Sequence, residues 1–99
     1  MNKVKLIGRL TRDPELNERS GHKVCDMRLA VNGPGNTPPL FIDVVAFGER
    51  AEQGAELKKG TQVEVDGALR YSEWQAKTGS KKTAKRSKHS VIAQELVAA

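Results

Sequence analysis

The most apolar stretch of the chain, residues 41–47, reads Phe-Ile-Asp-Val-Val-Ala-Phe. Apolar residues follow one another there with almost no alternation, so both faces of the segment are apolar. That pattern predicts a central strand with something to cover on each side. The fold must therefore supply strands beside it and a core beneath it.

The segments before this stretch alternate between apolar and polar residues. Residues 3–10 and 24–31 each have one apolar face, which predicts two strands. Pro14 breaks the pattern after the first strand because it cannot donate to a ladder, and Ser20-Gly21 marks a turn. Residues 32–39 hold two Gly and three Pro and are predicted to form a loop.

The segments after residues 41–47 first change from a strand-like to a helix-like pattern of residues. Residues 49–59 are rich in Ala, Glu and Lys and end at Gly60, which predicts a short helix weakened by Gly54. Residues 63–71 alternate again and predict a fourth strand. Residues 75–87 are polar and predict a mobile hairpin loop, and residues 89–97 predict a fifth strand.

Three strands, one short helix and two strands are the element order of an all-β, five-stranded Greek-key OB-fold barrel, with its helix between strands three and four. Other small barrels can share this order. The chain has 99 residues, which suits one domain over residues 1–99. The fold prediction is therefore a single OB-fold domain.

Composition narrows the function classes. Seventeen Lys and Arg against twelve Asp and Glu give a net charge of +5, which favours polyanions without saying which. Cys25 is the only cysteine, so an internal disulfide and a Cys-x-x-Cys zinc site are excluded, and its strand position predicts a buried thiol. No apolar run approaches the roughly 18–20 residues of a membrane span, and the N-terminus has no signal-peptide core. We expect a soluble, cytoplasmic protein with no membrane partner.

Nothing in the sequence groups catalytic side chains. His22 and His89 are paired with no nucleophile, and no phosphate-cradling glycine loop is present. Glu49, Glu52 and Glu56 fall at helical spacing, which is typical of a solvated helix face. We expect no enzymatic activity, no metal and no cofactor.

Positive charge is placed unevenly. Residues 75–94 contain no acid, and the first twelve residues contain none either. The six cations of the first of these segments are Lys77, Lys81, Lys82, Lys85, Arg86 and Lys88. A loop with charge of one sign fits a clamp on a phosphate backbone, whose affinity rises as counterions are released. The alternative is a solvated loop that aids solubility.

Aromatic residues are few. Stacking on a base contributes about 1–3 kcal/mol and tolerates any base. Trp74 stands between a predicted strand and the cationic segment, which favours a stacking platform over a core position. Phe41 and Phe47 are equally well explained as core residues or as stacking residues, and the residues alone leave that choice open.

Several motifs resemble bacterial single-stranded DNA-binding proteins. The resemblance lies in residues 1–4, 6–16, 28–32, 41–48, 57–60 and 65–74, in the family's order and spacing. It covers most of residues 1–74, whereas the last quarter matches only in outline.

This resemblance implies sequence-tolerant coating of single-stranded DNA in replication, repair and recombination, by an OB fold in a homotetramer. It places stacking residues at Phe41, Phe47 and Trp74, and backbone-contacting cations at Lys59 and Arg70. The family's long loop between strands four and five also holds DNA. With Arg9, the predicted DNA-binding residues are Phe41, Phe47, Trp74, Arg9, Lys59, Arg70, Lys77, Lys81, Lys82, Lys85, Arg86 and Lys88.

The chain departs from the family pattern at three places. Residues 32–39 are short and carry no aromatic or basic residue, and Glu49 stands where Lys or Arg is common. The chain stops at Ala99 without the flexible linker and acidic tip that recruit replication and repair proteins. That predicts a trimmed DNA-binding core or a short paralogue that does not recruit partners in this way.

Two other functions stay open at this point. The short form also resembles the dimeric primosomal replication proteins, so an assembly adaptor that docks on replication proteins is one alternative. An RNA-binding OB module is another, because charge and stacking act on either polymer.

Overall fold

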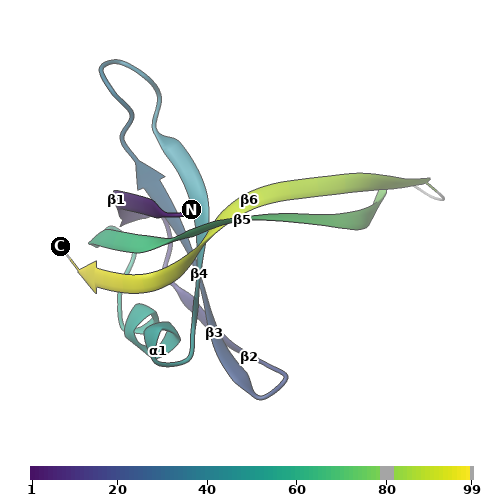
Figure 1. The fold of residues 1–99 in the computed structure, drawn as a ribbon, viewed down its shortest axis with the longest axis horizontal. Coiled ribbons are helices and arrows are strands. Elements are labelled where there is room, and N and C mark those ends of the chain that lie inside the picture. Colours follow the sequence, from purple (N-terminus) through teal and green to yellow (C-terminus); the bar gives the residue numbers. More distant parts are fainter. Residues whose placement is uncertain (79–81, 99) are drawn as a thin grey trace.

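The alternating segments form strands in the computed structural model, which describes residues 1–78 and 82–98. The elements along the chain are β1 (Val4–Leu10), β2 (Glu15–Arg19), β3 (His22–Val31), β4 (Leu40–Phe47), α1 (Glu49–Ala55), β5 (Gln62–Thr78) and β6 (Lys82–Ala98) (Figure 1). The all-β class with one helix between the β4 and β5 segments is confirmed.

The strands pair in the order β1-β5-β6-β4-β3-β2, and every pairing is antiparallel except that of β4 with β6. Strand β1 also meets β3, where Arg9 pairs with Ala30 and Leu10 pairs with Leu29. The sheet therefore curls back on itself and encloses a core.

One face of each strand supplies that core. Met27 on β3 lies opposite Val44 on β4, and Cys25 lies opposite Ala46, and all four side chains are buried. The core cluster consists of Leu10, Cys25, Met27, Leu29, Val44, Ala46, Ala51, Val63, Val65, Val91, Ala93 and Leu96. We call the side of the sheet that points away from this cluster the outer face.

The structure has six strands rather than the predicted five. The additional strand, β2, forms a hairpin with β3 in which Arg19 pairs with His22. The two residues between them, Ser20 and Gly21, have φ of 52° and 79°, as a two-residue type I′ turn requires. Every residue of β2 is exposed, so this segment has no apolar face and gives no strand pattern.

The helix is shorter than predicted. It ends at Ala55, whereas the sequence predicted an end at Lys59. Short turns at residue 56 and at residues 59–60 follow the helix, and the N–H of Leu57 donates to the carbonyl of Gly54 at 3.1 Å. The N–H of Gly60 then donates to the carbonyl of Leu10 at 2.8 Å. That contact directs the chain into β5 beside β1.

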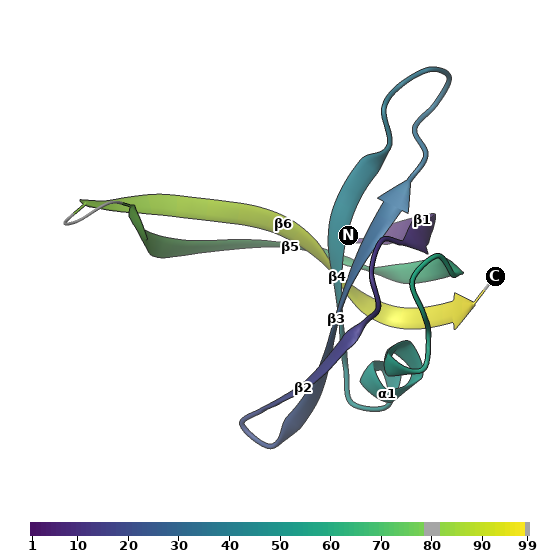
Figure 2. The same cartoon turned by 180° about the vertical axis from the view of Figure 1, so that it is seen from behind.

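The predicted loop over residues 75–87 is wrong for the described residues. Strands β5 and β6 continue their pairing to Thr78 and Lys82, and this two-stranded ribbon extends well beyond the other strands (Figures 1 and 2). Residues 79–81 lie outside the described part of the chain. The loop prediction failed because residues 75, 76 and 84–87 are not buried in a core, so this part of the sequence has no apolar alternation.

A small network stabilises one face of the ribbon. The rings of Tyr71 and His89, which are opposite each other in the register, have centroids 5.1 Å apart. The Tyr71 hydroxyl donates to Glu73 Oε1 at 2.5 Å, and Lys85 Nζ lies 3.1 Å from Glu73 Oε2. The hydrogen bond from Tyr71, followed by that from Lys85, lowers the pKa of Glu73.

Gly67 lies at the irregularity in the β5–β6 ladder and provides a stability test. A Cβ at this position would lie 2.0 Å from the carbonyl oxygen of Ile92. We expect Gly67→Ala to lower the free energy of unfolding by about 1–3 kcal/mol, as overpacking does, in urea titrations. Gly21→Asn is the control, because Gly21 has open space around it and Asn tolerates a positive φ. Equal losses in both variants would contradict the steric explanation.

The Tyr71 network provides a pH test. We expect Tyr71→Phe to raise the pKa of Glu73 toward its ordinary value, measured by carboxyl NMR titration, because its main hydrogen-bond donor is lost. A lowered pKa in the folded state stabilises the fold above the ordinary Glu pKa, and this stabilisation disappears as pH falls through the lowered value. Ser72→Ala, on the other face, is expected to leave the Glu73 titration unchanged. A similar shift in both variants would rule out the hydroxyl as the cause.

Candidate nucleic-acid interface

Phe41 and Phe47 are on the outer face of β4. Their positions differ by an even number, so they share a face, and the alternate positions Val44 and Ala46 point into the core. The two rings are 51% and 42% exposed. The structure therefore places both Phe side chains outside the core, which excludes the core interpretation of these residues.

A row of register partners joins four strands across this face. Arg28 on β3 pairs with Asp43 on β4, which pairs with Ser90 on β6, which pairs with Arg70 on β5. Partners in a sheet project to the same side. The predicted site residue Arg70 thus shares the outer face with the two Phe rings.

Trp74 lies on the same face, farther along the ribbon. It is four residues beyond Arg70 on β5, pairs with Arg86 on β6 and is 45% exposed. The prediction that Trp74 follows a strand is wrong, since β5 continues to Thr78. Its exposure nevertheless leaves the indole available to a ligand.

Arg9 reaches this face from β1. It pairs with Ala30, which in turn pairs with Phe41, so the three residues form a second row across the sheet. The guanidinium is oriented by the carbonyl of Gly60 at 3.1 Å and by Gln62 Oε1 at 3.4 Å. Neither acceptor is charged, so neither of them offsets the positive charge that Arg9 presents to an anionic ligand.

A groove of about 370 Å³ opens on the outer face next to the first row. Four cations and three acids are among its lining residues Arg12, Glu15, Arg19, Asp26, Met27, Asp43, Val45, Arg70 and Lys88. Arg70 and Lys88 are among the residues predicted from the sequence, whereas Arg12, Arg19 and the neighbouring Arg28 are not. For Arg28 a signal existed, because it alternates with the core residues Met27 and Leu29.

Acids from other strands neutralise part of the positive charge. Asp43 accepts from Arg28 at 3.0 Å and from Lys88 at 3.3 Å, and Asp26 lies 3.4 Å from Arg19. On the other face of the ribbon, Lys85 is paired with Glu73. The segment 75–94 carries charge of one sign in the sequence, but the fold places acids beside two of its cations.

Arg70 is different. Its Nε is buried and has no hydrogen-bond partner within residues 1–78 and 82–98. A buried donor without an acceptor costs about 1–3 kcal/mol. Arg70 also lines the groove, so its guanidinium carries a donor that the described residues leave unsatisfied beside a candidate anion site.

The remaining predicted cations come from separate segments of the chain. Lys59 is exposed in the turn before β5, where its backbone N–H donates to Asp13 Oδ1 at 2.8 Å, beside the groove residue Arg12. Lys77 and Lys82 belong to the ribbon strands, whereas Lys81 lies outside the described residues. Lys5, on β1, is paired with Glu64 at 3.1 Å.

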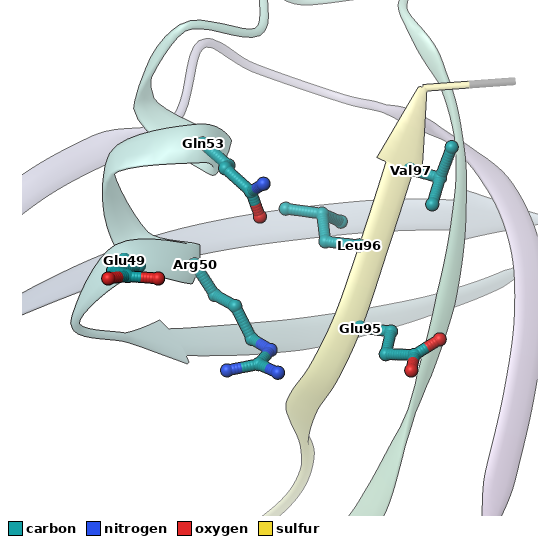
Figure 3. Close-up of a pocket in the computed structure, with 6 residues that line it drawn as sticks. All are labelled: Glu49, Arg50, Gln53, Glu95, Leu96 and Val97. Atoms are coloured by element: carbon teal, nitrogen blue, oxygen red, sulfur yellow. The ribbon is translucent and has the colours of Figure 1, made fainter.

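A second hollow, of about 290 Å³, separates α1 from the end of β6 (Figure 3). Gln53 and Leu96 extend toward each other across it, while Glu95 and Val97 point away from the helix. None of the predicted DNA-binding residues lines it, and Glu49 and Glu95 oppose an anionic ligand. The outer face is therefore the better candidate for an anionic polymer.

Cys25 is buried, and burial, assisted by the charge of Asp26, raises the pKa of its thiol to about 11. Such a thiol stays protonated at neutral pH and is a poor nucleophile. Across residues 1–78 and 82–98, His, Cys, Asp and Glu side chains nowhere gather in threes that could hold a metal ion. In the same residues, the structure contains no helix of the length and apolarity that crossing a membrane requires.

The chain is similar to known proteins over nearly its whole length. The model of the single-strand binding protein family matches residues 1–98. The single-stranded DNA-binding protein of Wolinella succinogenes is 38% identical, with 96% of this chain and 62% of that protein covered. That of Clostridium perfringens is 42% identical, with 83% of this chain and 57% of that protein covered.

The fold agrees with these sequence matches. A crystal structure of a deletion mutant of the single-stranded DNA binding protein from Thermus aquaticus superposes with a TM-score of 0.81 at 33% identity. The match covers 100% of this chain and 41% of that one. This neighbour confirms the predicted OB class, and the chain spans about three fifths of the length of the curated relatives it matches. The chain belongs to the single-strand binding protein family.

Proposed function

We propose that this chain binds single-stranded DNA without base specificity and without catalysing a reaction, and that it serves DNA replication, repair and recombination. The observation that carries the proposal is the set of three half-exposed aromatic rings, Phe41, Phe47 and Trp74, on one cation-bearing face. Every base has a π-face, so such rings hold single strands regardless of sequence.

The cations on this face account for the phosphate contacts. Arg9 and Arg86 are exposed on it, and Arg70 has a buried donor without a partner in the described residues. A strand that stacks on the rings would place its phosphates near these guanidinium groups. Counterion release should then make binding depend steeply on salt.

The choice of DNA over RNA rests on the relatives. The proteins of Wolinella succinogenes and Clostridium perfringens are named for single-stranded DNA binding. Stacking and charge alone would also accept RNA. We propose that residues 1–99 act as one binding domain whose ligand in the cell is DNA.

We further propose that the chain acts as a homo-oligomer, as a tetramer or a dimer. Ile7 and Val97 are 50% and 58% exposed, and β1 and β6 present them outside the core. Association would remove these apolar side chains from water. Sedimentation velocity is expected to give a mass of two or four chains, and a monomer at micromolar concentration would contradict the proposal.

Trp74→Ala tests the stacking surface. We expect the affinity for a labelled oligo(dT) to fall by about 1–3 kcal/mol, roughly 5- to 150-fold, because one stacking ring is lost. The loss should be similar for oligo(dC), because stacking tolerates any base. Fluorescence anisotropy of the labelled strand is the measurement, since it does not require Trp74 as the reporter.

Tyr71→Ala is the matched control. Its ring is 52% exposed on the same ribbon but lies on the opposite face, so little change in affinity is expected. A loss in Tyr71→Ala with none in Trp74→Ala would place the DNA on the other face. Weak binding by the wild type at low salt would instead favour the adaptor function.

A further inference from the structure

We propose that Asp43 competes with DNA phosphates for the cations of the groove, and so sets the affinity of the proposed single-strand binding below what the fold could provide. This inference rests on the proposed function, because it concerns the same face. Asp43 would be neither a ligand for DNA nor a passive structural acid. It would be an intramolecular stand-in for a phosphate.

The position of Asp43 supports this role. It lies on the outer face of β4, two residues from Phe41 and four from Phe47, so a strand stacked on both rings would pass over it. It also lines the groove together with Arg70 and Lys88. An acid at the centre of a surface for an anionic polymer is unfavourable unless it does something else.

Its contacts show what it does in the free protein. Oδ1 accepts from Arg28 Nη1 at 3.0 Å, and Oδ2 accepts from Lys88 Nζ at 3.3 Å. These cations come from β3 and β6, on the two sides of β4. Arg28 also lies over the Phe41 ring, with Cζ 5.8 Å from its centroid, so the carboxylate holds this guanidinium at a predicted stacking position.

The donors around Asp43 outnumber its oxygens. Ser90 and Arg70 follow Asp43 in the same register row, and the buried Ser90 Oγ and Arg70 Nε have no partner in the described part of the chain. A phosphodiester presents one negative charge on two free oxygens, as a carboxylate does. Arg28 and Arg70 of this row, together with Lys88 two residues before Ser90 on β6, are therefore donors suited to a phosphate, and a carboxylate already lies among them. Ser90 has no exposed surface and is not counted among the donors to a ligand.

Asp43 and a DNA phosphate compete because both are negatively charged and both pair with the same cations. A phosphate that approaches Arg28 and Lys88 must displace Asp43 from them or accept a second negative charge nearby. Either way, fewer cations are free to replace the counterions of the DNA. Binding is then weaker and less dependent on salt than the number of basic residues suggests.

Asp43→Asn in the full chain tests this inference, because the amide keeps the shape and removes the charge. Anisotropy titrations of labelled oligo(dT) over a series of salt concentrations give both affinity and salt slope. We expect binding about tenfold tighter, with a log–log slope more negative by about 0.7–1.4, which corresponds to one or two more phosphates neutralised on a single strand. Thermal denaturation checks that the variant is folded.

Glu64→Gln is the matched control, because it removes one negative charge from a pair with Lys5 at 3.1 Å and does not line the groove. We expect it to keep the wild-type slope. Adding Lys88→Gln to Asp43→Asn should return the slope part of the way to the wild-type value. These three results together support the inference.

Three results would overturn the inference about Asp43. Equal tightening in Asp43→Asn and Glu64→Gln would reveal only a general effect of net charge. Weaker binding in a folded Asp43→Asn would mean that Asp43 positions Arg28 and Lys88 for DNA rather than competing with it. Wild-type binding that Asp43→Asn leaves unchanged would overturn the inference alone. If the wild type itself fails to bind, the proposed function fails, so the two failures can be told apart.

Discussion

The register of β4 between β3 and β6 is the constraint on which the rest of the structure depends. It directs Val44 and Ala46 into the core, and by the same alternation it directs Phe41, Asp43 and Phe47 outward. A slip by one residue would exchange the two faces and expose the core. Core packing therefore determines the candidate interface, because the hydrophobic effect that buries one set of side chains fixes the other set on the opposite side of the sheet.

The parallel contact between β4 and β6 adds the ribbon to this surface. Only Asp43–Val45 pair with Ser90–Ile92, yet this short ladder aligns β5 through its long antiparallel pairing with β6. The rows across the sheet then continue into the ribbon as far as Trp74. An aromatic residue on a projecting ribbon and two on the body thus share one face, which suits an extended polymer better than a small ligand.

On the outer face, negative charges offset part of the positive charge, so the face is not a uniformly basic patch. The chain has an excess of five positive charges, but on this face acids from β3 and β4 pair with cations on β2, β3 and β6. Ion pairs at exposed sites are individually weak, so they do little for stability. Their effect on an anionic ligand is larger, because each paired cation must be released before it can neutralise a phosphate.

The resemblance to single-stranded DNA-binding proteins and the distribution of charge indicated part of the candidate site. The sequence alone determined the all-β class, the place of the helix and the strands with one apolar face. These follow from local periodicity, which each segment displays by itself. Only the tertiary structure decided the existence of β2 and the extension of the ribbon, since neither has a face buried in the core and both are held by pairing with a neighbour. It alone decided that Phe41 and Phe47 are exposed and that Asp43 faces Arg28 and Lys88. Those facts depend on which strands lie side by side, and contacts between residues distant in sequence leave no periodic signal in either partner.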